Sequence, residues 1–381
     1  MAIVEQIAGA AVTVVVLLDV FLTILYARAG AELLSPVVAR TIWRLFRLVS
    51  RPFGRHRGRV LSFCGPVILV ALIVVWAAGL ALGAGLIMHP HLGGGIRASQ
   101  GPTPTDFMSA LYAGASSLSF VGSGDFTPQS APFRALYMLN SLIGTAVMSL
   151  VLTYVMQIYN ALRSRNALGL AIQTFSNDTG DAAELIAGLG PQGQFNSGYN
   201  NLSSLALNAC EVKESHHFYP LLFYFRFTEP YYSVSKGSTV LLDTVSLMKG
   251  GISDDEYRWL KESAAVAQCW RVATLLVGTL EEVFLPGAPA HGPDASDAGA
   301  RERWRTRYMA ALARMQQAGI KTIADPAAGF ETYASLRARW DGQIARLRAS
   351  MLYDAGEIDA PTYRPDLVAA RPPFEHRLRD V

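Results

Sequence analysis

Three long apolar stretches dominate the first half of the chain. Residues 7–27 contain a single acid, Asp19, and residues 60–88 and 135–162 contain no charged side chain. Each stretch is at least as long as the roughly 20 residues that a helix needs to cross about 30 Å of hydrocarbon. The pattern therefore predicts three membrane-spanning helices. No basic segment precedes the first of them, which argues against a secretory signal.

Asp19 lies in the middle of the first predicted span, where an ionisable side chain is costly unless it faces protein or water. One interpretation is an ion path through the membrane. The favoured interpretation is a partner in a neighbouring helix, such as a Tyr, Ser or Arg side chain.

Basic residues indicate the orientation of these helices. Residues 28–59 carry eight arginines against one acid, Glu32, so the positive-inside rule places this loop in the cytoplasm. The N-terminus is then outside, and the long part of the chain after the third span is inside. We divide this region into an N-terminal transmembrane helix at 1–30 and a basic amphipathic segment at 31–59.

Four arginines of the basic segment are spaced by four, three and four residues and so share one helical face: Arg40, Arg44, Arg47 and Arg51. One interpretation is an amphipathic helix that binds anionic lipid at the inner leaflet. The other, equally weighted, is that these arginines only fix the topology.

The composition agrees with a membrane protein, because 51% of the residues are apolar and only 17% are charged. Residues 1–162 hold 10 basic against 5 acidic side chains, so the basic excess lies in the apolar half, which argues against a nucleic-acid-binding protein.

Cys64, Cys210 and Cys269 are too scattered for a disulfide framework or a zinc site. We find no catalytic motif, and we expect no enzyme, no cofactor and no bound metal.

The segment between the second and third spans, residues 102–133, is apolar but broken by Gly, Ser and Pro. Irregular backbone at membrane depth is tolerated only where protein or water surrounds it, so we expect a re-entrant loop that begins with a helix at 106–118. Two glycines alternate in the run that follows, Phe120-Val121-Gly122-Ser123-Gly124-Asp125. Such alternation allows a backbone in which successive carbonyls point the same way and line a pore.

This region resembles the pore domain of prokaryotic members of the potassium-channel superfamily. That family places a membrane helix, a pore helix, a filter reading TVGYGD and an inner helix in this order. The matching elements here, within a pore domain at 60–165, are residues 60–88, 106–118, 120–125 and 133–162. Asp125-Phe126-Thr127-Pro128 is also similar to the D-x-x-P exit of the family.

The resemblance implies roles for individual residues. The ion-conducting filter would consist of Phe120, Val121, Gly122, Ser123 and Gly124. Ser119 and Asp125 would support it, with Asp125 favoured as a hydrogen-bond acceptor behind the filter over a cation attractor. Gly144 matches the hinge glycine of the inner helix, and close helix packing is an equally weighted role.

The resemblance also implies the assembly, because one filter segment cannot enclose an ion. Four copies would surround an axis as a homotetramer, in the bacterial inner membrane, with K⁺ as the expected permeant ion. Two departures weaken the expectation of strict selectivity: Phe120 stands where the family has threonine, and Ser123 stands where it has tyrosine. A phenyl ring supplies no oxygen to a dehydrated cation, so we expect permeation by monovalent cations rather than by potassium alone.

The rest of the chain has no run long enough to span and predicts a helical cytosolic domain at 166–355 and a flexible tail at 356–381. Within that domain, a capping box at Ser253 opens a helix that extends to Phe284, and a linker and two further helices follow at 286–299, 301–319 and 327–353.

The stretch from His216 to Tyr232 is the most aromatic part of the sequence. A buried core helix is the default interpretation. The alternative is an amphipathic element against the inner leaflet or the ends of the inner helices, where it would sense the gate. The adjacent His216 and His217 suit no metal site, and we expect them at the surface or at a helix start.

The sequence therefore predicts an all-α membrane protein with three transmembrane helices, a re-entrant pore helix and filter, and a helical cytosolic domain. The expected function is a tetrameric cation channel regulated by that domain. The alternative is a non-conducting membrane receptor or scaffold that keeps the pore-loop architecture while Phe120 seals the pore.

Overall fold

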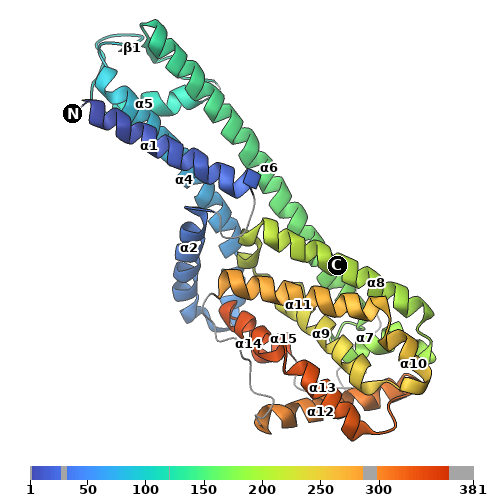
Figure 1. Cartoon of the computed structure of the whole chain (residues 1–381). Coiled ribbons are helices and arrows are strands. Elements are labelled where there is room, and N and C mark those ends of the chain that lie inside the picture. The colour runs from blue at the N-terminus through green and yellow to red at the C-terminus, as the bar shows by residue number, and fades with distance from the viewer. Residues whose placement is uncertain (1, 27–31, 120, 286–297, 360–381) are drawn as a thin grey trace, which may run out of the picture. The chain divides into compact units, whose positions relative to one another are not determined.

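The computed structural model describes residues 2–26, 32–119, 121–285 and 298–359 (Figure 1). Phe120, most of the 286–299 linker and residues 360–381 of the predicted tail lie outside the described residues. The prediction of a flexible tail from residue 356 is wrong at its start, because residues 356–358 belong to helix α15 (Ala355–Ile358). The chain forms two compact units. The first consists of Met1–Asn160 and Phe218–Phe225, and the second of Ala161–His217 and Arg226–Val381.

The first unit is helical apart from one short antiparallel sheet, so the prediction of a helical membrane protein is confirmed with that addition. Three described stretches are long and apolar enough to cross a membrane: Ala2–Tyr26, Arg57–His91 and Ala131–Phe175. The elements are α1 (Ala2–Val20), η1 (Phe21–Tyr26), α2 (Ser35–Val49), η2 (Arg51–His56), α3 (Arg57–Ser62), α4 (Cys64–Met88), η3 (His89–His91), β1 (Ile96–Ala98), α5 (Phe107–Leu118), β2 (Phe126–Pro128) and α6 (Ala131–Phe175).

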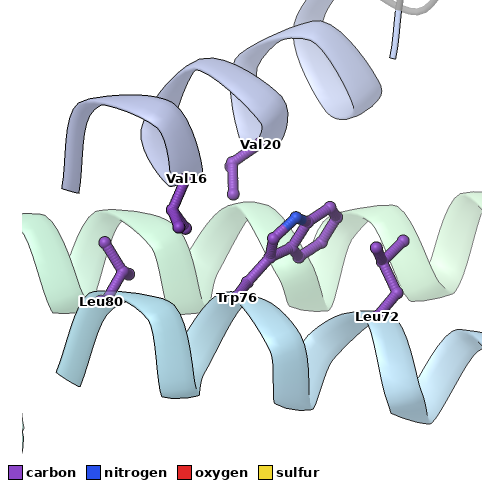
Figure 2. Packing of buried hydrophobic residues seen from close by; sticks show 5 residues of the cluster. All are labelled: Val16, Val20, Leu72, Trp76 and Leu80. Atoms are coloured by element: carbon purple, nitrogen blue, oxygen red, sulfur yellow. The ribbon is translucent and has the colours of Figure 1, made fainter. Parts of the chain in front are cut away.

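Small residues bring α1 and α4 together. A Cβ atom at Gly83 would lie 2.3 Å from the Thr13 hydroxyl oxygen and 2.9 Å from the Gly9 carbonyl oxygen. Figure 2 shows Val16 and Val20 of α1 pointing toward α4, where Leu72, Trp76 and Leu80 are also buried. In lipid such close packing replaces the hydrophobic effect as the main attraction between helices.

Asp19 is fully buried and holds the start of α2 in place. One carboxylate oxygen accepts hydrogen bonds from the backbone N–H groups of Leu33 and Leu34, at 2.8 and 2.7 Å, and the other accepts from the Trp76 indole at 2.7 Å. Leu34 is the N-cap residue of α2, so the carboxylate satisfies backbone donors just before the first turn of that helix. The favoured interpretation of a partner in a neighbouring helix is confirmed, but the partners are an indole and two amides.

The aromatic stretch does not form the predicted core helix, because Pro220 interrupts it. Only its first residues belong to a helix, and residues 220–224 form a 3₁₀ turn, η5 (Pro220–Tyr224). This turn packs inside the first unit. The Tyr224 ring lies 6.0 Å from that of Trp43 on α2, and the Phe225 ring lies 6.4 Å from that of Tyr159 on α6. The turn thus contacts the basic helix and the third span, which is closer to the alternative interpretation.

The second unit surrounds helix α9 (Val234–Gly251), and almost all residues of this helix are buried. Asp243 of α9 has no exposed surface and accepts hydrogen bonds from Arg307 at 2.7 Å, Arg337 at 2.9 Å and Tyr333 at 2.9 Å. The elements are α7 (Ala182–Leu189), η4 (Pro191–Gly193), α8 (Asn196–Phe218), η6 (Pro230–Tyr232), α9 (Val234–Gly251), α10 (Asp254–Lys261), α11 (Ala264–Phe284), α12 (Ala298–Gln317), α13 (Pro326–Arg337), α14 (Asp341–Ser350) and α15 (Ala355–Ile358).

Four predictions of helix extent and capping are wrong. Ser253 precedes α10 without a side-chain capping bond, and the single helix predicted to reach Phe284 breaks at Ser263, whose hydroxyl caps α11 instead. The two helices meet at an angle of 58°, and together they are long and apolar enough to cross a membrane. The helix predicted at 327–353 divides in the same way into α13 and α14. The inner helix predicted at 133–162 continues as α6 to Phe175, because charged residues need not end a helix.

His216 is buried, not at the surface. Its Nδ1 pairs with the Val212 carbonyl at 2.9 Å, and its Nε2 has no hydrogen-bond partner in the described structure. Burial, with a contribution from the nearby Arg165 charge, lowers the pKa of His216 to about 3. The ring is therefore neutral at physiological pH.

Candidate pore and filter

The pore helix α5 begins at an acidic cap. The Asp106 carboxylate accepts from the Ser109 backbone N–H at 3.0 Å and from its hydroxyl at 2.7 Å. These bonds hold the pKa of Asp106 below its usual value, so the cap stays ionised. Farther along, Gly114 packs directly on α4, where a Cβ atom would lie 2.5 Å from the Gly85 nitrogen.

The C-terminal end of α5 packs against the first third of α6. The Asn140 amide donates to the Ser117 hydroxyl at 2.9 Å, and both side chains are buried. One turn beyond, a Cβ atom at Gly144 would lie only 1.9 Å from the Leu118 carbonyl oxygen. Gly144 therefore has a packing role in an uninterrupted helix. Its role as a hinge stays a prediction.

The backbone after α5 has the alternation that the two glycines allow. Gly122 and Gly124 have φ angles of +63° and +72°, the left-handed region in which a Cβ atom is unfavourable. Neither has another atom within 4 Å of where its Cβ would lie, and Val121 is 88% exposed. Four consecutive filter residues, Val121 to Gly124, thus lie on an open surface of the single chain.

Hydrogen bonds from Tyr112 and from Ser99 hold the end of the candidate filter near Asp125. The Tyr112 hydroxyl of α5 donates to the Asp125 carboxylate at 2.5 Å. On the other side, the Ser99 hydroxyl donates to the Gly124 carbonyl, and the Ser99 N–H donates to the Asp125 carbonyl at 2.8 Å. Ser99 directly follows β1, which pairs with β2. The sheet therefore connects the loop before α5 to the candidate filter.

The hydroxyls of Ser119 and Ser123 form only long hydrogen bonds with backbone N–H groups of the candidate filter segment. The Val121 N–H lies 3.4 Å from the Ser119 hydroxyl, and the Asp125 N–H lies 3.4 Å from the Ser123 hydroxyl. Both distances are at the long end for hydrogen bonds. Within the described residues, Ser119, Asp125 and Val121 to Gly124 follow one another in a single segment after α5. Gly144 lies on another helix, α6, where it packs against Leu118, the last residue of α5.

A stripe of hydroxyl side chains on α6 was not predicted from the sequence. Thr145, Ser149 and Thr153 recur every fourth residue, and all three are exposed. Each hydroxyl donates to the carbonyl four residues earlier, at 2.8 to 3.0 Å. The opposite side of the helix is buried in its own chain, at Asn140, Tyr154 and Ile158. Hydroxyl residues at every fourth position of an apolar span share one helical face, so this stripe could have been predicted from the sequence.

No group of His, Cys, Asp or Glu side chains within the described ranges could hold a metal ion. The polar groups gathered here are backbone carbonyls, hydroxyls and two carboxylates that already accept hydrogen bonds. This arrangement can coordinate passing cations, but it offers no activated nucleophile or general base.

Comparison with known proteins assigns the class. Residues 67–161 match the family model described as an ion channel, and this range contains most of α4, all of α5, the candidate filter and α6 up to residue 161. The chain therefore carries the pore domain of that ion-channel family, which is a family of channels and not of enzymes. The prediction of a pore domain is confirmed.

The chain is also similar to the uncharacterized membrane protein YdjJ of Bacillus subtilis (strain 168). The two are 20% identical over 250 residues, which cover 65% of this chain and 70% of that protein. No solved structure gives a significant match. Together with its spans, this relative makes the chain a multi-pass membrane protein.

Proposed function

We propose that four copies of this chain surround a common axis and conduct monovalent cations across the membrane. The observation that supports this most directly is the pair of left-handed glycines, Gly122 and Gly124, in an exposed segment that follows the pore helix. Val121 in that segment is 88% exposed in the single chain. Neighbouring copies would cover it.

Ions would be coordinated by main-chain oxygens in place of their water shell. The carbonyls of Val121, Gly122 and Ser123 are the candidates, because the Gly124 carbonyl accepts a hydrogen bond from Ser99. The C-terminal end of α5 would add about half a negative charge toward the cavity. Below the filter, the hydroxyl stripe of α6 would face water.

Selectivity for potassium over sodium is expected to be weak. Ser123 replaces the aromatic brace with a small side chain, and the Tyr112–Asp125 and Ser99–Gly124 bonds hold the outer filter instead. K⁺ remains the expected ion, with measurable Na⁺ permeation. The N-terminus is expected outside the cell and the second unit in the cytoplasm, in the bacterial inner membrane.

The test is current through the purified protein in planar bilayers. Unitary currents with a reversal potential set by K⁺ and Na⁺ gradients would support the proposal. Gly122→Ala should abolish conduction, because it forces a Cβ atom into a left-handed backbone. Gly101→Ala is the matched control: Gly101 has φ +71° and open space, but lies in the external loop. Equal loss in both variants would contradict a specific filter role.

The scaffold alternative makes a different prediction for the same recording. A silent protein that conducts once Phe120 is replaced by threonine would point to a sealed or normally closed pore. A protein that is silent in both forms, although folded and tetrameric, would reject the channel.

We further propose that α2 lies at the inner leaflet and binds anionic lipid through Arg40, Arg44 and Arg47, together with Arg51 at the start of η2. Ser35, Ala39 and Trp43 form its buried face. Val37, Leu45 and Leu48 are about half exposed, and on a helical projection the arginines lie between these apolar residues and the buried face. That order of faces suits a helix with its apolar side in acyl chains and its cations at headgroups.

Nanodiscs containing either phosphatidylglycerol or phosphatidylcholine would test the lipid proposal. Phosphatidylglycerol should raise the unfolding temperature of the native protein, and Arg44→Gln with Arg47→Gln should remove most of that gain. Arg258→Gln, an exposed arginine on α10, should leave it unchanged. A gain that all three proteins share would show that the α2 arginines only fix topology.

A further inference from the structure

A cavity of about 310 Å³ lies in the second unit, between α12, α14 and α15. This volume is at the lower end of the range for small-molecule sites in proteins and suits a molecule of about mononucleotide size. Helices rather than long loops form its walls. Its shape is therefore set by packing in the folded unit.

Arginine dominates the charge of this cavity, with four arginines against two aspartates. Arg307 and Arg337 are already bound to the buried Asp243, at 2.7 and 2.9 Å. Arg303 and Arg348 also line the cavity, and in the described structure neither forms an ion pair with a carboxylate. Two guanidinium groups without a carboxylate partner suit the several acceptor oxygens of a phosphate group.

The cavity also contains an acceptor that lacks a donor. One oxygen of the Asp359 carboxylate accepts from Arg337, but the other is buried without a hydrogen-bond partner among the described residues. Its neighbour, an Arg307 nitrogen, is 3.8 Å away, beyond hydrogen-bond length. A buried acceptor left in this way is costly, and a ligand hydroxyl or amino group would satisfy it.

Apolar surface completes the site, because Trp304 and Ile344 line the cavity and are both buried. We propose that the cavity binds a small phosphate monoester, with its phosphate on Arg303 and Arg348 and a hydroxyl or amino group donating to Asp359. Binding would stabilise one packing of α12, α14 and α15, and so supply a differential contact through which a metabolite acts on this unit. The proposal does not depend on conduction.

The experiment is a calorimetric titration of the purified full-length protein in detergent with adenosine 5′-monophosphate, glucose 6-phosphate, inorganic phosphate and succinate. At least one of the two monoesters should bind saturably, one per chain, and more tightly than inorganic phosphate. Arg303→Ala with Arg348→Ala should weaken that binding by roughly tenfold or more. Arg258→Ala removes one charge elsewhere in the unit and should not change it.

A second variant tests the cavity without changing its charge. Ala345 lines the cavity, so Ala345→Phe should fill it and abolish monoester binding while the circular dichroism stays native. Failure of both monoesters to bind would overturn the proposal. So would binding of succinate alone, or monoester binding that persists in both the double arginine variant and Ala345→Phe.

Discussion

At the scale of single residues, glycine has two different roles in this chain, and at one position it has neither. Gly122 and Gly124 supply a left-handed backbone, whereas Gly144 and Gly114 supply close approach between helices. Gly278 of α11 does neither, because nothing lies within 4 Å of where its Cβ would be. The same substitution is therefore expected to have opposite effects at different positions.

Gly144→Ala should destabilise the first unit by about 1–3 kcal/mol, because a methyl group would overlap the Leu118 carbonyl oxygen and push α5 from α6. Gly278→Ala should stabilise the protein by roughly 0.5–1 kcal/mol, since it removes only unfolded-state freedom. Thermal unfolding in detergent measures both. If Gly144→Ala leaves stability intact but changes opening, the hinge role is favoured over packing.

His216 should make the second unit less stable in acid. Its folded pKa of about 3 is below the ordinary 6.5, so the unfolded state takes up a proton first as the pH falls. The contribution of the buried neutral ring is full above pH 6.5 and is lost progressively toward pH 3. At pH 5 the loss is about 2 kcal/mol.

Unfolding temperatures at pH 7.5 and pH 5 check this prediction. His216→Gln should show a smaller fall than the native protein, whereas His217→Gln should behave as the native protein does. An unchanged pH dependence in His216→Gln would mean that other groups carry it.

At the scale of elements, the sequence predicted best where one physical constraint dominates. Span length located α1, α4 and α6, and the run from Asp106 to Leu118 predicted α5 within a residue of its start. Breaks inside helices were not predicted, because the apolar periodicity continues through Ser263, whose hydroxyl forms the local cap at the start of α11.

For the candidate filter, too, only some features could be predicted from the sequence. Its glycine alternation could be read from the residues alone, but the Ser99 contact could not, since it joins residues 25 apart through a sheet that no periodicity announces. The hydroxyl stripe was visible in the spacing, but its exposure required the packing of α6. The Phe218–Phe225 turn depended on tertiary contacts with α2 and α6 that local pattern does not encode.

The attachment of α2 provides an element-scale prediction. Asp19→Leu leaves the Leu33 and Leu34 amides and the Trp76 indole without their acceptor, which should cost at least about 2 kcal/mol. Trypsin should then cut at the exposed arginines of α2 faster than in the native protein. Val14→Leu, an exposed change on the same helix, is the control. Equal cleavage rates would mean that α2 is held by its buried face alone.

At the scale of the whole molecule, the assembly determines which face of α6 meets water. If four copies converge on this helix, Thr153→Cys in a Cys210→Ser background should react with a charged methanethiosulfonate reagent and change the current. Val147→Cys, which packs toward the α1–α4 cluster, should not respond. Reaction at Val147 but not at Thr153 would place the hydroxyl stripe in lipid and reverse the proposed pore lining.

The two units are not consecutive along the chain, because Phe218–Phe225 returns to the first unit. The Phe225 ring fills the space beside Gly65, where a Cβ atom would lie 2.5 Å from it. A protein cut short after the third span would lose this filling and leave Gly65 and Trp43 bare. The first unit is therefore complete only when Phe218–Phe225 is present, and we expect a shortened form without these residues to be less stable.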